Sequence, residues 1–156
     1  MQNDNSNAND IPNNSIPHQG LIGFVKSFRN HLMRQYIDGY YIGNIYYGDN
    51  SITYFPFTPK NLKSQKLKIA IVFNHHDLRF EIWLAGQNKQ IQKQYWEIFK
   101  DSDWHKYHIP STIADGYSIV DNILVMNPDF DNYEILAEQI ETGALEFIKE
   151  IENVLK

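Results

Sequence analysis

The chain has 156 residues, of which 42% are hydrophobic and 14% aromatic, and its formal net charge is −5. This composition is typical of one globular domain and excludes a mainly disordered or collagen-like chain. The acidic balance argues against general nucleic-acid binding, because such proteins need a basic face that neutralises phosphates. A local basic patch of Lys60, Lys63, Lys66 and Lys68 would still allow it, and the alternative interpretation of these lysines is a solvated loop and strand edge.

The chain contains no cysteine, which excludes disulfides, cysteine nucleophiles and thiolate metal sites. No apolar run approaches the roughly 20 residues that span a bilayer. The N-terminus lacks the basic start and apolar core of a signal peptide. We therefore expect a cytoplasmic protein that has no membrane partner.

Residues 1–17, MQNDNSNANDIPNNSIP, are mostly Asn, Asp and Ser. They cannot bury enough apolar surface to offset the entropy of ordering, so we predict a disordered tail and a single domain over residues 18–156. The first helix is predicted over 19–37, ending near Asp38 and Gly39. Its apolar face has i, i+3, i+4 spacing and consists of Leu21, Phe24, Val25, Phe28, Leu32 and Tyr36.

The segments YYIGNIYY and ITYFPF are rich in aromatic and β-branched residues, and GDNS between them is a turn sequence. They predict a hairpin over residues 40–57. Pro56 predicts that the second strand ends there or lies at a sheet edge. The next segment, TPKNLKSQK, is predicted to be a loop or one short helical turn.

LKIAIVF is apolar at nearly every position, which predicts a central third strand, and RFEIWLA predicts a fourth. A turn over residues 75–78 pairs Phe73 with Phe80, so one face is apolar and also carries the pairs Ile71 with Ile82 and Ile69 with Leu84. The opposite face then carries Ala70, Val72, Asn74, Arg79, Glu81 and Trp83. A slip of one residue would mix the two faces, which favours this register.

A middle helix is predicted after Asn88, its N-cap, with an apolar stripe of Ile91, Tyr95, Ile98 and Phe99. WHKYHI is predicted to be a short strand ending at Pro110, and SIVDNILV a further strand or, alternatively, a helix. NPDFDN precedes a long final helix, whose apolar side is formed by Leu136, Ile140, Ala144, Phe147, Ile148, Ile151 and Leu155.

The predicted order is therefore αββββαββα. It indicates an α+β fold with a largely antiparallel or mixed sheet of five to six strands, packed by an N-terminal, a middle and a long C-terminal helix. The opening αβββαβ portion is also the order of the restriction-endonuclease-like core, so a degenerate form of that core is an alternative. Such an analogy carries no chemistry by itself.

The stretch FNHHDLRFEIW concentrates titratable residues around a predicted turn. Neighbouring residues on a strand point to opposite faces, so His75 and His76 would share one ion only if the turn reoriented them. Metal-binding pairs usually lie at i, i+2 on strands or i, i+4 on helices. We interpret the stretch as a hairpin turn, and a metal role for His75 and Asp77 is the weaker alternative.

Glu81 falls in the middle of a predicted central strand, between Arg79 and Trp83 on the same face. A carboxylate there must be exposed, paired or functional, because burying it alone is costly. It is either the partner of Arg79 in a structural ion pair or a binding-site carboxylate.

A divergent metal-dependent nuclease or hydrolase is the enzymatic alternative, and it alone would need Mg²⁺ or Mn²⁺. Nucleases of the endonuclease-like fold use an acidic residue and an E-x-K triplet. Here Trp83 stands where the lysine belongs, so the motif is incomplete. Asp49, Asp77 or His75 would have to join Glu81, and Lys68 would have to replace the lysine.

The segment TYFPFTPKNLKSQKLKIAIVFNHHDLRFEIWLAGQNKQIQKQYW resembles the central signature of an uncharacterised family of small bacterial proteins. The resemblance extends from about Phe28 to the final helix and implies no activity. The polar and aromatic members of its pattern are Arg79, Glu81, Trp83, Asn88, Gln92 and Trp96. Gln92 and Asn88, just beyond the end of Glu81's strand, form a candidate site for a small ligand or a partner's backbone, although capping and packing explain them equally well.

The tyrosines gather on the predicted hairpin, at positions 40, 41, 46, 47 and 54, and tyrosine is favoured at interfaces and ligand pockets. Together with the missing catalytic constellation, they favour a non-enzymatic cytoplasmic binding module without a cofactor, with a protein partner or a second copy of the chain. A host-interaction or defence factor that binds a basic partner through its acidic final helix is a further hypothesis.

Overall fold

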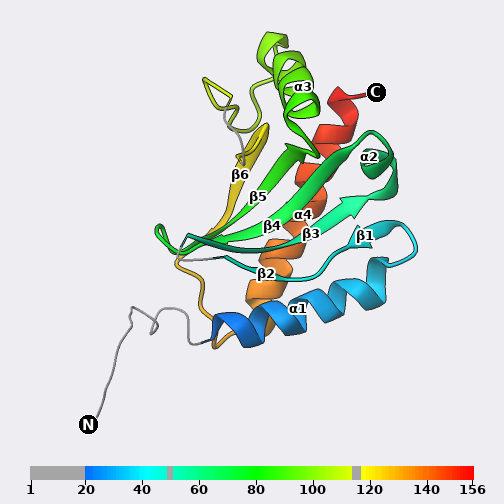
Figure 1. Ribbon diagram of the computed structural model, residues 1–156. Coiled ribbons are helices and arrows are strands. Elements are labelled where there is room, and N and C mark those ends of the chain that lie inside the picture. Colours follow the sequence, from blue (N-terminus) through cyan, green and yellow to red (C-terminus); the bar gives the residue numbers. More distant parts are fainter. Residues whose placement is uncertain (1–19, 49–50, 114–116) are drawn as a thin grey trace.

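Within residues 20–48, 51–113 and 117–156, which the computed structural model describes, six strands form one sheet that four helices flank (Figure 1). The helices are α1 (Leu21–Tyr36), α2 (Lys60–Ser64), α3 (Lys89–Asp101) and α4 (Tyr133–Val154). The strands are β1 (Tyr40–Ile42), β2 (Tyr46–Tyr47), β3 (Ile52–Pro59), β4 (Leu67–Asn74), β5 (Arg79–Gly86) and β6 (Val120–Met126). The predicted tail over 1–17 lies outside the described residues and stays a prediction.

The sheet has the order β1-β3-β4-β5-β6, with β2 pairing to β3, and every pairing is antiparallel. The α+β prediction and the central place of β4 are therefore confirmed. The predicted register of β4 and β5 is also confirmed, because Phe73 pairs with Phe80 and Ile71 with Ile82. None of the helices in the described ranges is long and apolar enough to cross a bilayer.

Helices α1 and α4 cover one face of the sheet, which we call the core face. Phe24 of α1 contacts Phe80 of β5, and Phe28 contacts Phe55 of β3. Figure 1 shows α4 passing behind the strands along the same face. Each large apolar side chain buried there contributes roughly 1.5–3 kcal/mol to stability. Alternation along β3, β4 and β5 therefore fixes which side of the sheet is covered.

The opposite face of the sheet, which we call the open face, is not crossed by a helix of the described residues. In Figure 1 it turns toward the viewer, with α2 and α3 at the ends of the strands. By register it carries Tyr54 of β3, Lys68 and Ala70 of β4, and Trp83 and Ala85 of β5.

The predicted first strand, YYIGNIYY, is split in two. Its ends form β1 and β2, which both pair with β3, and Gly43 lies in the break between them. The break lies beside Pro56, whose carbonyl accepts a hydrogen bond from the Gly43 amide at 3.1 Å. A side chain at Gly43 would come within 2.8 Å of the Pro56 ring, so this close approach requires glycine.

The sequence predicted that Pro56 ends its strand or lies at the edge of the sheet, and both alternatives are wrong. β3 continues to Pro59, and Pro56 pairs with Ala70 on its other side. A missing N–H is tolerated in a strand interior when no neighbouring strand needs it. The interruption of the adjacent strand provides that condition, and Arg29 Nε holds the break by donating to the Gly43 carbonyl at 2.6 Å.

WHKYHI is not a strand, and it makes one isolated bridge between His108 and Asp121 of β6. Trp104 and Tyr107 both pack inward, against Phe99 and Phe147. In a strand, residues three apart point to opposite faces, so Trp104 and Tyr107 could not both pack inward. The neighbouring segment SIVDNILV was predicted correctly as a strand, β6, and TPKNLKSQK contains the single helical turn α2.

Helix α3 begins after Asn88, whose Oδ1 accepts from the Ile91 amide at 2.9 Å, so the predicted N-cap is confirmed. Its predicted stripe is wrong in one member, because Ile98 is exposed. Phe99 is buried as predicted, and Gln92, which was not part of the predicted stripe, is buried as well. In α4 the predicted apolar side is buried up to Ile151, and Leu155 follows the last helical turn.

Candidate functional site

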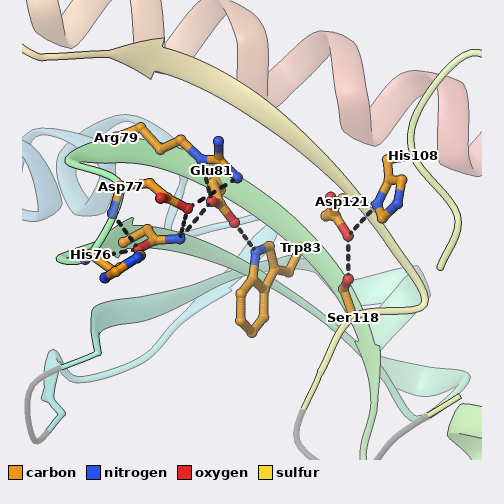
Figure 2. A network of polar contacts seen from close by, with 9 residues as sticks. His76, Asp77, Arg79, Glu81, Trp83, His108, Ser118 and Asp121 are labelled. Carbon is orange, nitrogen blue, oxygen red and sulfur yellow. Dashed lines mark hydrogen bonds and ion pairs between the residues drawn. The ribbon is translucent and has the colours of Figure 1, made fainter.

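Glu81 is the centre of a polar network on the open face (Figure 2). Its side chain is buried, with 6% of the residue exposed. Oε2 accepts from Arg79 Nε at 2.7 Å and from Asn74 Nδ2 at 3.1 Å, and Oε1 accepts from Trp83 Nε1 at 2.7 Å. Three of about four acceptor positions on the carboxylate are thus filled by protein donors.

Spacing on β4 and β5 produces this network. Arg79, Glu81 and Trp83 lie two residues apart and therefore share one face, and the register places Asn74 opposite Arg79. The pairing with β6 shifts between Phe80 and Glu81, a β-bulge beside the carboxylate. The predicted Arg79–Glu81 pair is formed, and Trp83 belongs to the same network.

Arg79 joins two carboxylates. Its Nε binds Glu81, while its Nη2 lies 3.6 Å from Asp77 Oδ2. The hydrogen bond to Glu81 is the main cause that raises the pKa of Arg79, and it outweighs the opposing effect of burial. The position between these carboxylates is therefore held by a permanent cation.

The turn over residues 75–78 is organised by Asn74, as the hairpin interpretation expects. Asn74 Oδ1 accepts from the amides of His76 and Asp77, both at 3.0 Å. His75 contacts Thr53 Oγ1 through Nε2 at 2.8 Å, and Thr53 pairs with Phe73, a residue of the core face. His75 thus lies on the opposite side of the sheet from Glu81.

A metal site would need three or more ligands close together, and no such group of His, Cys, Asp or Glu exists in the described part of the chain. Asp49, the upstream acidic residue of the enzymatic alternative, lies outside the described residues. Asp77 is near Glu81, but Arg79 and Asn74 contact both carboxylates. Lys68 is on the same face, at the other end of β4.

Asn88 and Gln92 lie at the other end of β5 from Arg79, where the strand meets α3. Gln92 is 6% exposed, and both ends of its amide are used. Oε1 accepts from the Gly86 amide and Nε2 donates to the Tyr117 carbonyl, both at 2.7 Å. Gln92 therefore fastens the start of α3 to β5 and to the segment before β6.

A cavity of about 340 Å³ opens on the open face between these two clusters. We call it the sheet pocket. Ala70, Ala85 and Gly86 form its small-residue part, and Tyr54, Trp83 and Tyr117 are its aromatic residues. Its volume lies in the range of small-molecule sites, which are usually mostly apolar with a few polar groups.

Three of the predicted site residues line the sheet pocket, namely Trp83, Asn88 and Gln92. Arg79 and Glu81 do not line it, but Glu81 holds the Trp83 indole N–H at 2.7 Å. Tyr54 is one of the tyrosines that the sequence associated with interfaces and ligand pockets, whereas sequence reasoning missed Ala85 and Tyr117. It considered Lys68 as part of a basic patch or as a replacement for a nuclease lysine, whereas Lys68 lines this pocket.

Ser118, His108 and Asp121 form a second polar cluster, which the sequence did not predict (Figure 2). The Asp121 carboxylate accepts from Ser118 Oγ at 2.5 Å, and His108 Nδ1 lies 3.1 Å from both of its oxygens. A nucleophilic serine would instead donate its proton to the histidine. The cluster therefore ties the loop before β6 to that strand.

A third cluster joins α1 to α4. Glu141 receives a hydrogen bond from Tyr36 Oη at 2.5 Å, and its other oxygen lies 2.8 Å from His31 Nε2. Burial, then the hydrogen bond and charge of Glu141, raise the pKa of Tyr36 to about 12. His31 and Glu141 are 110 residues apart, so no local pattern could have indicated this contact.

The described residues form an antiparallel α+β fold in which no helix crosses one face of the sheet. The chain belongs to a family described as a domain of unknown function (DUF7000), whose model matches residues 5–155. This membership confirms that the chain resembles an uncharacterised family. No curated protein and no solved structure matches the chain.

Proposed function

We propose that this protein is a non-enzymatic cytoplasmic binding module that takes a small ligand in the sheet pocket. The observation that carries the proposal is a cavity of about 340 Å³ on the open face, with three aromatic residues in its lining. A bacterial origin and a cytoplasmic location, as the sequence indicated, are part of the proposal.

The pocket is supported by groups that are already held in place. Glu81 fixes the Trp83 indole, and Gln92 fixes Gly86 relative to α3. A preformed site loses less conformational entropy when it binds a ligand. The polar side chains around Glu81 thus have a positioning role in this proposal and none in bond breaking.

Fragment mapping tests the proposal. A library of small fragments is screened against the ¹⁵N-labelled full chain, and amide shifts are followed. We expect the binding fragments to shift the amides of Ala70, Trp83 and Gln92 together. Fragment shifts that avoid these residues, or that scatter over the surface, would contradict it.

The enzymatic alternative is a metal-dependent nuclease or hydrolase with a degenerate restriction-endonuclease-like core. Thermal unfolding with Mg²⁺, Mn²⁺, Zn²⁺ and Ni²⁺ distinguishes it from the binding module. The binding module predicts no metal-specific stabilisation. A metal at about 100 times its Kd would raise the melting temperature by about 5–10 °C. Such a shift, lost in Asp77→Asn, would favour the enzyme.

A second copy of the chain is the partner that the hairpin supports best. Tyr41, Tyr46 and Tyr47 are 46%, 53% and 51% exposed, and they lie on the short strands β1 and β2. Exposed aromatic residues grouped at one edge are typical of an interface. We therefore propose that this edge forms a homodimer.

Sedimentation equilibrium over a range of concentrations tests the homodimer. The wild-type chain is expected to show a monomer–dimer equilibrium, and the double variant Tyr46→Ser/Tyr47→Ser is expected to be monomeric with an unchanged circular dichroism spectrum. A wild-type chain of monomer mass at every concentration would refute the dimer and leave the ligand pocket untouched.

A further inference from the structure

The lining of the sheet pocket differs in charge from the rest of the molecule. The chain carries a net charge of −5, yet among the described residues the pocket is lined by Lys68 and Lys89 and by no aspartate or glutamate. No ion pair involves Lys68 within the described ranges. The pocket thus has a positive side chain at its wall that a negatively charged ligand group can approach.

The shape of the pocket favours a flat group. Ala70 pairs with Trp83 on neighbouring strands, and Ala85 pairs with Lys68. The two alanines carry single-carbon side chains, so the strand surface between the larger residues is low and flat. Tyr54 and Trp83 also line the pocket. Aromatic side chains bind planar rings by stacking or edge-to-face contact.

The aromatic wall is also held in a fixed orientation. Trp83 Nε1 donates to Glu81 Oε1 at 2.7 Å, and Arg79 and Asn74 hold the same carboxylate through its other oxygen. The indole therefore cannot rotate without leaving a buried carboxylate oxygen unpaired. A fixed ring beside a lysine is a suitable receptor for a ring that carries a negative group.

We propose that the sheet pocket binds a planar aromatic or heteroaromatic ring that carries a carboxylate or a phosphate. The ring lies over Ala70 and Ala85 beside Trp83, and the anionic group faces Lys68. This inference rests on the proposed binding function and names the chemical class of its ligand. Both a free aromatic acid and a nucleoside monophosphate have this chemistry.

The test uses four probes and the full chain. Naphthalene-2-carboxylate is the planar anion, naphthalene-2-carboxamide is its neutral match, and cyclohexanecarboxylate keeps the charge without the flat ring. Adenosine monophosphate is the nucleotide probe. Each is titrated into ¹⁵N-labelled protein, and Kd is obtained from the amide shifts of the pocket residues.

We expect at least one planar anion, naphthalene-2-carboxylate or adenosine monophosphate, to shift the pocket amides. The Kd of this planar anion should be at least about 10-fold lower than the Kd of the neutral ring and of the non-planar acid. Tighter binding of the nucleotide assigns the source to nucleotides, and tighter binding of the naphthoate assigns it to aromatic acids.

Two lysine variants separate charge from folding. Lys68→Gln is expected to weaken the planar anion about 3- to 10-fold, as for a partly exposed charge contact. Lys26→Gln removes a lysine from the exposed side of α1 and is the matched control, with an expected Kd equal to that of the wild type. Unchanged affinity in Lys68→Gln overturns the proposal.

The remaining outcomes are distinguishable. Equal binding of naphthalene-2-carboxamide, or of cyclohexanecarboxylate, would show that the ligand class is wrong, while the fragment map would still support the pocket itself. If neither the probes nor any library fragment shifts the pocket amides, the proposed function fails together with this inference.

Discussion

At the scale of single residues, Glu81 is a buried carboxylate whose replacement should destabilise the fold. Glu81→Gln leaves an acceptor for Trp83 but leaves the Arg79 guanidinium without its closest carboxylate. We predict a loss of roughly 1.5–3 kcal/mol in unfolding free energy, the value of a hydrogen bond to a charged group. The half-buried Arg79 guanidinium then keeps, among the described carboxylates, only Asp77, at 3.6 Å.

Urea unfolding of the two proteins measures this loss. Glu97→Gln, at an exposed position on α3, is the matched control and should change stability by less than about 0.5 kcal/mol. If Glu81→Gln were as mild as that control, the network would not be a structural element of the open face.

Tyr36 gives the fold a dependence on high pH. An ordinary tyrosine has a pKa of 10.0, and burial and Glu141 raise the pKa of Tyr36 to about 12. The folded state thus prefers the neutral phenol, so the stabilisation is complete below pH 10 and is lost as pH rises from 10 to about 12.

The comparison with Tyr36→Phe isolates this effect. At neutral pH the unfolding free energy of the wild type should exceed that of the variant by about 1.5–3 kcal/mol, the value of a hydrogen bond to a charged group. Denaturant titrations at rising pH should show that difference shrinking between pH 10 and 12. A difference that stays constant across this interval would exclude the Tyr36–Glu141 contact as its source.

At the scale of elements, the junction between β5 and α3 depends on Gly86. A methyl group there would lie 2.5 Å from the Gln92 backbone nitrogen and 2.8 Å from its Cα. Backbone cannot yield as a side chain does, so Gly86→Ala should displace the start of α3. We predict a loss of about 1–3 kcal/mol, the typical cost of overpacking.

Gly23→Ala is the matched control, because Gly23 is exposed in α1 and nothing lies within 4 Å of its added Cβ. Alanine is the better helix former by about 0.8–1.0 kcal/mol, so this variant should be stabilised. Thermal unfolding therefore should give the two glycine variants opposite signs. The same sign for both would contradict the close packing of β5 against α3.

The register of β4 and β5 could be predicted because alternation runs through both strands and one face must be apolar. The Asn88 cap could be predicted because its signal is local. The break at Gly43 could not, since it depends on contact with Pro56 on another strand. The strand predicted for WHKYHI is wrong because the packing of its aromatic side chains outweighs its β propensity.

The same division between local and distant contacts applies to the candidate site. Arg79, Glu81 and Trp83 could be grouped from the sequence because they are neighbours on one face of one strand. The sheet pocket combines residues from β3, β4, β5, α3 and the segment before β6. The sequence alone did not indicate that Lys68 and Lys89 line one pocket, because they lie on different elements that meet only in the folded chain.

At the scale of the whole molecule, the sheet is covered unequally. Helices α1 and α4 bury the core face, while no helix of the described ranges crosses the open face (Figure 1). The open face contains the sheet pocket. The tyrosine edge at β1 and β2 adjoins this pocket, because Tyr46 packs on Tyr54, a lining residue, with 5.0 Å between the ring centroids. A dimer through that edge would therefore lie beside the ligand site.

The central claim, that the sheet pocket is the binding site, is tested most directly by filling it. Ala85→Phe adds a ring inside the pocket, and Ser27→Phe adds the same ring at an exposed position of α1. Fragment mapping is repeated on both variants. We predict that Ala85→Phe stays folded and loses the pocket shifts, whereas Ser27→Phe keeps them. Unaltered fragment binding by folded Ala85→Phe would contradict the claim.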